Sequence, residues 1–175
     1  MIANRYEPLE LALPGTAVKA RDMQTAQTVM LRPVTRVDER LRGIFHPSLL
    51  TIFDVVRDGA TTFVACEFVP GRSLRLIMGG QPFNSRRAAE IVAEVADGAA
   101  ELHARGIAHG AITVDTVLLT AKGKAKLDLV HTLDSNESAD VDQLRGLYAA
   151  LVGRGQPGLT AAGSAAVLAA RLRSL

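Results

Sequence analysis

Most of the side chains in this sequence that could do chemistry lie in one stretch, residues 101–134. It reads ELHARGIAHGAITVDTVLLTAKGKAKLDLVHTLD and carries three of the four histidines. Histidine can bind a metal or transfer protons near neutral pH. The histidines have no metal-ligand spacing such as H-E-x-x-H, so we expect turn or hydrogen-bonded core residues at His46, His103, His109 and His131. No serine near a histidine stands in a nucleophile-elbow context, which argues against a hydrolase of that type.

A long amphipathic helix is predicted to position the beginning of this stretch. Asn84 is suited to cap its first turn, and Arg105-Gly106 marks its end. Between these limits, apolar residues recur at helical spacing at Ala88, Ile91, Val92, Val95, Ala96, Ala99 and Leu102.

Two short strands and two further helices are predicted after it. The strands lie near residues 116–120 and 124–129 and are joined by a turn at Lys122-Gly123. A second amphipathic helix is predicted over about residues 140–152, and an alanine-rich third helix over residues 161–172.

The beginning of the chain instead predicts a sheet. Three strands are expected over residues 6–12, 16–21 and 27–34, and two more flank Asp58-Gly59, a strong hairpin signal. The charged segment 36–43 is compatible with a short helix that stops at its final glycine.

A sheet followed by helices predicts an α+β protein with two lobes. The sheet lobe is expected over residues 1–70, where Pro70-Gly71 ends the sheet, and the reduced helical lobe over residues 71–175. With 175 residues, the chain is long enough to bury most of its apolar surface.

Composition excludes several classes of protein. Net charge is +2 without a clustered basic face, which does not favour nucleic-acid binding. The single cysteine, Cys66, excludes an intramolecular disulfide and a cysteine-rich metal site. No apolar run is long enough to span a bilayer and the first residues do not resemble a signal peptide, so we expect a cytoplasmic domain without direct membrane insertion.

Four segments in this order resemble a bacterial Ser/Thr protein kinase domain of the eukaryotic type, over about residues 5–153. RYEPLELAL and GTAVKARD resemble its first two strands around the nucleotide loop. HPSLLTIFDVVRDGATTFVACEFVPGRSL resembles the fourth and fifth strands and the hinge, which places Cys66 at the gatekeeper position. VADGAAELHARGIAHGAITVDTVLLTAKGKAKL resembles the long helix and catalytic loop, and ADVDQLRGLYAALVGRGQPG resembles the anchoring helix of the large lobe. The resemblance implies a two-lobed kinase-like fold with a truncated helical lobe.

The nucleotide-binding elements of that family are altered in the first lobe. Kinases hold phosphate with a G-x-G-x-x-G loop and a lysine paired to a helix glutamate. LALPGTAVKA keeps only Gly15 and is short, which predicts a closed hairpin. Arg32 in VMLR stands at the lysine position and lacks its compact ammonium group. Asp38 or Glu39 could pair with Arg32, although a surface ion pair is the simpler interpretation.

The catalytic loop, H-R-D-x-K-x-x-N in the family, is HGAITVDT here. His109 matches the first position, whose role in the family is structural. The base position holds Ala111, which cannot accept a proton. The lysine position holds Thr113 and the metal-binding asparagine position holds Thr116.

The second metal ligand of the family, the aspartate of D-F-G, is also displaced. An ungapped count from the catalytic loop places Leu129 at that position. Asp128 could serve only with a one-residue deletion, which would turn its side chain to the opposite face of the strand. Only HTLDSNES then precedes the anchoring helix, so no substrate-binding platform is expected.

These losses imply a pseudokinase: no enzyme, no metal and no cofactor, but a protein-binding regulatory module. The chain resembles actinobacterial pseudokinases, and among them the cytoplasmic pseudokinase domain of the mycobacterial MviN-type, MurJ-like peptidoglycan lipid flippase. That resemblance implies control of peptidoglycan synthesis, phosphorylation by an active Ser/Thr kinase, and recruitment of a forkhead-associated domain protein. Thr160 and Thr132 are the candidate phosphoacceptors, although an ordinary turn or cap hydroxyl is the simpler interpretation of each.

Two alternatives stay open at this point. Metal-independent ATP binding or a very weak Ser/Thr kinase would rest on Arg32, Asp128 and an intact hinge at residues 66–69. A dimerisation module would use the last helix, although packing of that helix on its own lobe is the preferred interpretation. Its apolar residues are Val167, Leu168, Leu172 and Leu175.

Overall fold

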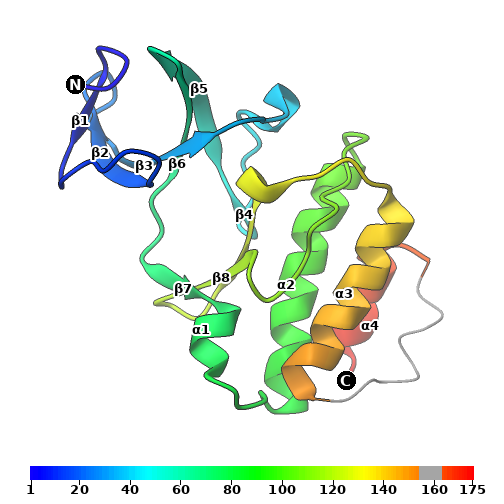
Figure 1. Cartoon of the computed structure of the whole chain (residues 1–175). Helices are drawn as coiled ribbons and strands as arrows, with labels where there is room; N and C mark the ends of the chain where they lie inside the picture. Colours follow the sequence, from blue (N-terminus) through cyan, green and yellow to red (C-terminus); the bar gives the residue numbers. More distant parts are fainter. Residues whose placement is uncertain (154–162) are drawn as a thin grey trace. The chain divides into compact units, whose positions relative to one another are not determined.

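The computed structural model describes residues 1–153 and 163–175. They form two compact units (Figure 1). The first contains Met1–Phe45 and Leu50–Val69, and the second contains His46–Leu49 and Pro70–Leu175. Each unit is described by itself.

The first unit is built on a five-stranded antiparallel sheet, which confirms the predicted α+β class. Its strand order is β1-β2-β3-β6-β5. The strands are β1 Tyr6–Pro8, β2 Val18–Asp22, β3 Thr28–Val34, β5 Ile52–Asp58 and β6 Thr61–Glu67.

The predicted strand over residues 6–12 is wrong after Pro8. Its alternating leucines resembled a half-buried strand, but Leu11 is 83% exposed. Pairing with β2 ends because the Glu10 side chain, in place of a backbone carbonyl, accepts the hydrogen bond from the Lys19 N–H at 2.8 Å. A turn at Leu13–Thr16, where the Thr16 N–H donates to the Leu13 carbonyl at 3.2 Å, then leads into β2.

The predicted helix over residues 36–43 is a single 3-10 turn, η1 Glu39–Leu41. Asp38 caps it by accepting hydrogen bonds from the N–H and guanidinium of Arg40. Gly43, at φ +75°, ends it in the left-handed conformation that favours glycine.

The predicted hairpin at Asp58-Gly59 is confirmed between β5 and β6. Pro33 lies in β3 beyond the part that pairs with β2, which ends at Leu31. Proline lacks an N–H, and at Pro33 only the β6 side of the strand is paired.

The second unit is centred on the predicted long helix, α2 Ser85–His103. Asn84 caps it by accepting a hydrogen bond from the Arg87 N–H at 2.8 Å. Helices α3 Glu137–Val152 and α4 Ala165–Arg173 pack against α2 (Figure 1). Helix α3 begins three residues earlier than predicted because Asn136 caps it. Helix α4 begins later than predicted because Ser164 is its cap.

A second sheet has the order β4-β9-β8-β7. Strands β8 Val117–Thr120 and β9 Ala125–Asp128 match the two predicted strands, and β9 packs on α2. The sequence did not predict β4 Leu49–Leu50, β7 Gly71–Ser73, the one-turn helix α1 Leu74–Met78 or the 3-10 turn η2 Leu129–His131.

Candidate functional site

Residues 109–116, which we call the catalytic loop for their resemblance to that element, are held by a buried carboxylate of helix α3. Asp140 is fully buried and accepts three hydrogen bonds. The His109 N–H and the His103 Nε2–H donate to Oδ2 at 2.7 and 2.8 Å, and the Gly110 N–H donates to Oδ1 at 2.7 Å. A carboxylate with this many donors orders the backbone around it, because each donor left unsatisfied in the interior would be costly.

A second side chain of α3, Gln143, binds the next part of the loop. Its Nε2 donates to the Gly110 carbonyl at 3.0 Å, and its Oε1 accepts from the Ile112 N–H at 2.8 Å. Asp140 and Gln143 are three residues apart on one helix, which places them on the same face. The sequence analysis did not identify either role, although a polar pair at this spacing on an otherwise apolar helix face is a detectable signal.

Thr116 closes the loop from within. Its hydroxyl donates to the Ala111 carbonyl at 2.5 Å and accepts from the Thr113 N–H at 2.9 Å. A hydroxyl has only one proton, so in donating to the Ala111 carbonyl Thr116 uses its single hydrogen-bond donor. Thr113 itself is exposed, and its Oγ1 accepts from the Asp115 N–H at 3.2 Å.

His109 is fully buried and serves as a structural connector, as expected for a hydrogen-bonded core residue. Its Nε2 lies 2.9 Å from the Asp128 carbonyl, and its Nδ1 accepts from the Ala111 N–H at 3.2 Å. These partners require a proton on Nε2 and none on Nδ1, which is the neutral tautomer. Burial, which disfavours the charged ring, lowers the pKa of His109 below its ordinary value of 6.5.

Asp128 and Leu129, the two candidates for the family's second metal ligand, lie at the end of β9. Leu129 is fully buried and begins the turn η2. Asp128 is 5% exposed and caps that turn, with Oδ1 accepting from the Val130 N–H at 3.1 Å. Its Oδ2 lies 3.7 Å from His131 Nε2. Among the described residues, no group of three or more His, Cys, Asp or Glu side chains is placed to hold a metal ion.

The candidate positions in the first unit lie on β3, on β6 and in the loop that precedes β2. Arg32 is half-buried on β3, opposite Val64 of β6. Asp38, considered as its partner, binds Arg40, and this pair holds the pKa of Asp38 below its usual range. Gly15 is exposed at φ +75° in the turn before β2. Cys66 is fully buried, and its thiol donates to the Met30 carbonyl at 3.3 Å.

The two candidate phosphoacceptors differ in what the structure says of them. Thr132 follows η2, and its hydroxyl donates to the Leu129 carbonyl at 2.8 Å, so the hydroxyl takes part in a turn. Thr160 lies outside the described residues.

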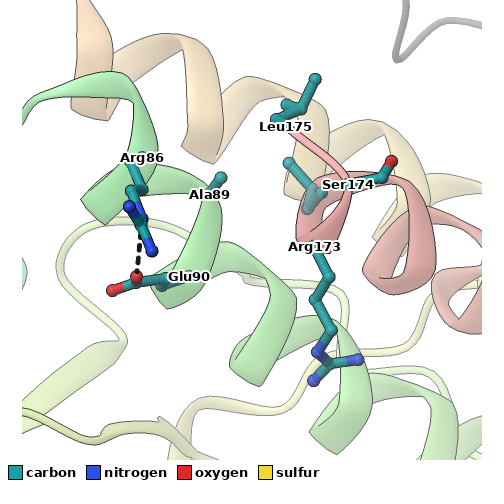
Figure 2. A pocket seen from close by; sticks show the side chains of 7 residues that line it. Arg86, Ala89, Glu90, Arg173, Ser174 and Leu175 are labelled. Atoms are coloured by element: carbon teal, nitrogen blue, oxygen red, sulfur yellow. Dashed lines mark ion pairs between the residues drawn. The ribbon is translucent and has the colours of Figure 1, made fainter.

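A shallow pocket of about 300 Å³ lies between α2 and α4 (Figure 2). Its charged side chains already have partners in the same unit. Arg86 is directed toward Glu90, with 3.7 Å between Nε and Oε1, and Arg173 pairs with Asp97.

The last helix is largely committed to its own unit. Leu168 and Leu172 are buried, as the packing interpretation predicted, whereas Val167 and Leu175 are 45% and 59% exposed. Within the described part of the chain, no helix is both long enough and apolar enough to cross a membrane.

Comparison with known proteins identifies the family to which the chain belongs. Residues 15–141 match the family model described as protein tyrosine and serine/threonine kinase. The chain is 36% identical over 90 residues to the serine/threonine-protein kinase PkaB of Streptomyces coelicolor. The aligned residues make up 50% of this chain and 22% of that protein. It is 26% identical over 132 residues to the probable serine/threonine-protein kinase pknA2 of Bifidobacterium longum, covering 72% of this chain and 17% of that protein. The chain therefore spans about a fifth of the length of these relatives. By the match over residues 15–141, the chain belongs to the protein tyrosine and serine/threonine kinase family.

Proposed function

We propose that this chain is a pseudokinase domain, a catalytically inactive member of the family that acts as a protein-binding regulatory module. The observation that carries the proposal is the catalytic loop itself. Its backbone is held by Asp140, Gln143 and Thr116, while the position of the base holds Ala111. A methyl group cannot accept the proton of a substrate hydroxyl.

The metal-binding positions support the same proposal. Kinase catalysis depends on positioning and on metal ions that neutralise the phosphate charge. Magnesium prefers several hard oxygen ligands in octahedral geometry. The Thr116 hydroxyl oxygen already accepts a hydrogen bond from the Thr113 N–H, and Leu129 is a buried apolar residue. Asp128 remains as a carboxylate, and it caps η2. These residues do not fit a magnesium–nucleotide site of the family's type.

The first unit adds an independent argument. A phosphate-binding glycine loop needs successive backbone N–H groups directed at the ligand. Here the Leu9 N–H donates to the Lys19 carbonyl, and the Thr16 N–H donates to the Leu13 carbonyl. Pro14 has no N–H to offer. The turn that contains Gly15 is therefore a hairpin connection and not a phosphate cradle.

The proposed role is recruitment of a protein partner in the control of peptidoglycan synthesis. An active Ser/Thr kinase would phosphorylate the chain, and a forkhead-associated domain protein would bind the phosphothreonine. The resemblance to the pseudokinase domain of the MurJ-like flippase is the basis for this role. Thr160 is the preferred acceptor over Thr132, because the Thr132 hydroxyl is engaged with Leu129 and acidic residues surround it in the sequence.

Thermal unfolding with and without ATP tests the loss of nucleotide binding. A ligand at 100 times its Kd stabilises a protein by about 2.7 kcal/mol, which raises Tm by roughly 2–4 °C for a domain of this size. We expect no shift in either magnesium or EDTA. A magnesium-dependent shift that Asp128→Asn abolishes would contradict the proposal and favour a surviving metal site. A shift in EDTA would favour ATP as a metal-independent structural ligand.

Recruitment is tested with an active actinobacterial Ser/Thr kinase and a forkhead-associated domain. We expect phosphate on the wild-type chain and its loss in Thr160→Ala, with Thr132→Ala as the matched control. Binding of the forkhead-associated domain should follow phosphate incorporation across the three proteins. Binding to the unphosphorylated chain, or its absence from the phosphorylated one, would contradict this mode of recruitment.

A further inference from the structure

The charged residues of the first sheet are sorted by face. Residues directly opposite one another on antiparallel strands point to the same side, and successive residues alternate. On the side of the core residues Val29 and Ala65, the register places the carboxylates Asp22, Asp54, Asp58 and Glu67. On the opposite side, which we call the basic face, it places every basic residue of these strands: Lys19, Arg21, Arg32 and Arg57. The one strand carboxylate on the basic face is Glu7, opposite Arg21 at the β1 edge.

The four cations of the basic face form a diagonal row. Measured along β3, the levels of residues 28, 30, 32 and 34 are taken in turn by Arg21, Lys19, Arg32 and Arg57. The row therefore advances about 20 Å along the strands, and from β2 to β5 it crosses three strand spacings of about 4.8 Å (Figure 1). An extended segment of about eight residues spans this length, and it presents alternate side chains to the same side. Carboxylates on alternate residues of such a segment match the row in number and direction.

The two ends of the row are available to a ligand. Arg21 and Arg57 are exposed, and within the described part of the chain neither has an ion-pair partner. The Lys19 ammonium lies 4.3 Å from the centroid of the Phe68 ring, a cation–π contact that holds it in position. Arg32 is half-buried and already takes part in an interaction within the chain, so a ligand is held mainly by Lys19 and by the two ends.

Apolar side chains between the cations favour a protein ligand. Met30, Val34 and Val55 lie on the same face and are half-buried, so the face offers apolar contact beside positive charge. Single-stranded nucleic acid needs aromatic rings on which its bases stack, and the ring beside this face, Phe68, is already covered by Lys19. We propose that the basic face binds an extended acidic segment of a partner protein. This site rests on the proposed function only in that the chain acts as a protein-binding module.

Fluorescence anisotropy with a labelled acidic peptide tests the site. The probe is a peptide of about eight residues in which glutamate alternates with serine, and the control peptide has glutamine in place of each glutamate. We expect saturable binding of the glutamate peptide to the whole chain at low ionic strength, with an affinity that falls as salt is added. No binding of the glutamate peptide, or equal binding of both peptides, would overturn the proposal.

A matched pair of double variants separates this face from net charge. Arg21→Gln with Arg57→Gln removes the two ends of the row. Arg72→Gln with Lys122→Gln removes two exposed cations of the second unit that likewise have no ion-pair partner among the described residues. We expect the Kd of the glutamate peptide to rise about 10-fold in the first pair and less than about 2-fold in the second. Glu7→Gln should lower the Kd, because it removes the carboxylate of this face. Equal weakening by the two double variants would overturn the site.

Inorganic triphosphate distinguishes a peptide site from a phosphate site. We expect it to compete with the glutamate peptide no better than its charge and the added salt require. Tighter binding of triphosphate than of the peptide, lost in the variant that lacks Arg21 and Arg57, would make the face a phosphate site and overturn the proposal. Failure of peptide binding with a Tm unchanged by ATP would leave the assignment as a pseudokinase standing, whereas conversion of ATP by a chain that binds the peptide would contradict that assignment alone.

Discussion

The catalytic loop and the segment 9–17 resemble two parts of a kinase site, the catalytic loop and the nucleotide loop, and they differ in how far their backbone groups are hydrogen-bonded. In the catalytic loop, side chains from α3 and from the loop itself bind most backbone groups between His109 and Thr113. In residues 9–17, only a few backbone bonds remain, and three leucines are about half or more exposed. The first region is a folding element of its unit, whereas the second is a surface connection between two strands.

The two regions differ in whether they also stabilise the fold. A loop that organises the interior must stay satisfied even when its chemistry is absent, because buried unpaired polar groups destabilise the fold. A loop that only contacts phosphate can shorten and lose its glycines without such a cost. Substitutions in the two regions should therefore differ strongly in their effect on stability.

The largest expected effect is at Asp140. Asp140→Ala leaves the donors of His103, His109 and Gly110 without their acceptor, so we expect a loss of about 3–5 kcal/mol in the free energy of unfolding. Urea unfolding measures it. Asp142→Ala on the same helix is the control, since this side chain is 70% exposed and should change stability by less than about 0.5 kcal/mol. Similar losses in both variants would contradict a special role for Asp140.

The next effect concerns the ion cluster of the first unit. The Arg5 guanidinium binds both oxygens of Asp22, at 2.9 and 2.7 Å, and holds the pKa of Asp22 well below its usual range. We expect Asp22→Asn to cost about 2–3 kcal/mol. Because the folded pKa is lowered, this stability is present above the unfolded pKa of about 3.9 and is lost as pH falls through the folded value. Unfolding curves of wild type and variant should converge in acid; a constant difference would contradict this assignment.

The pH dependence of the second unit should act through His109. Its pKa is lowered by burial, so folding favours the neutral ring. The unfolded chain then binds more protons than the folded chain as pH falls through the unfolded pKa of about 6.5, so stability should fall as pH decreases from 7. The acidic groups that face the ring, Asp128 and Asp140, oppose this trend, and His131 adds to it. His109→Gln should flatten the slope in urea unfolding, and an unchanged slope would exclude His109 as its source.

The smallest effect is expected in residues 9–17. Leu11→Ala should change the free energy of unfolding by less than about 0.5 kcal/mol, because this side chain is 83% exposed. Leu31→Ala, on the buried face of β3, is the matched control and should cost about 2–5 kcal/mol. A large loss for Leu11→Ala would show that the segment packs against the fold and would break the comparison.

Local patterns predicted much of the framework. The caps and spacing of α2, the hairpin at Asp58-Gly59 and five strands of the first sheet were all predictable from short-range signals. Strand β1 was overestimated because alternating leucines suggest one buried face, and only packing decides whether that face is covered. The three-residue strand β7 and the one-turn helix α1 are too short for periodicity to reveal them.

The candidate site was predictable only in part. The loop could be located from its resemblance to a family motif. The polar pair Asp140 and Gln143 was detectable on α3, but its binding partner was not, because the pair lies about 30 residues further along the chain and reaches the loop through the packing of α3. The close approach of Leu133 and Ser135 to Gly110 likewise depends on the path of the backbone, which a sequence pattern does not encode.

The most direct test of the account is the conversion of ATP to ADP by the purified chain in magnesium, because it does not depend on a choice of protein substrate. Asp128→Asn is the matched control, since Asp128 is the carboxylate next to Leu129, which stands at the family's metal-binding position. The account predicts that wild type and variant both convert ATP no faster than buffer alone. Faster conversion by the wild type that Asp128→Asn abolishes would show a working site and contradict the assignment as a pseudokinase.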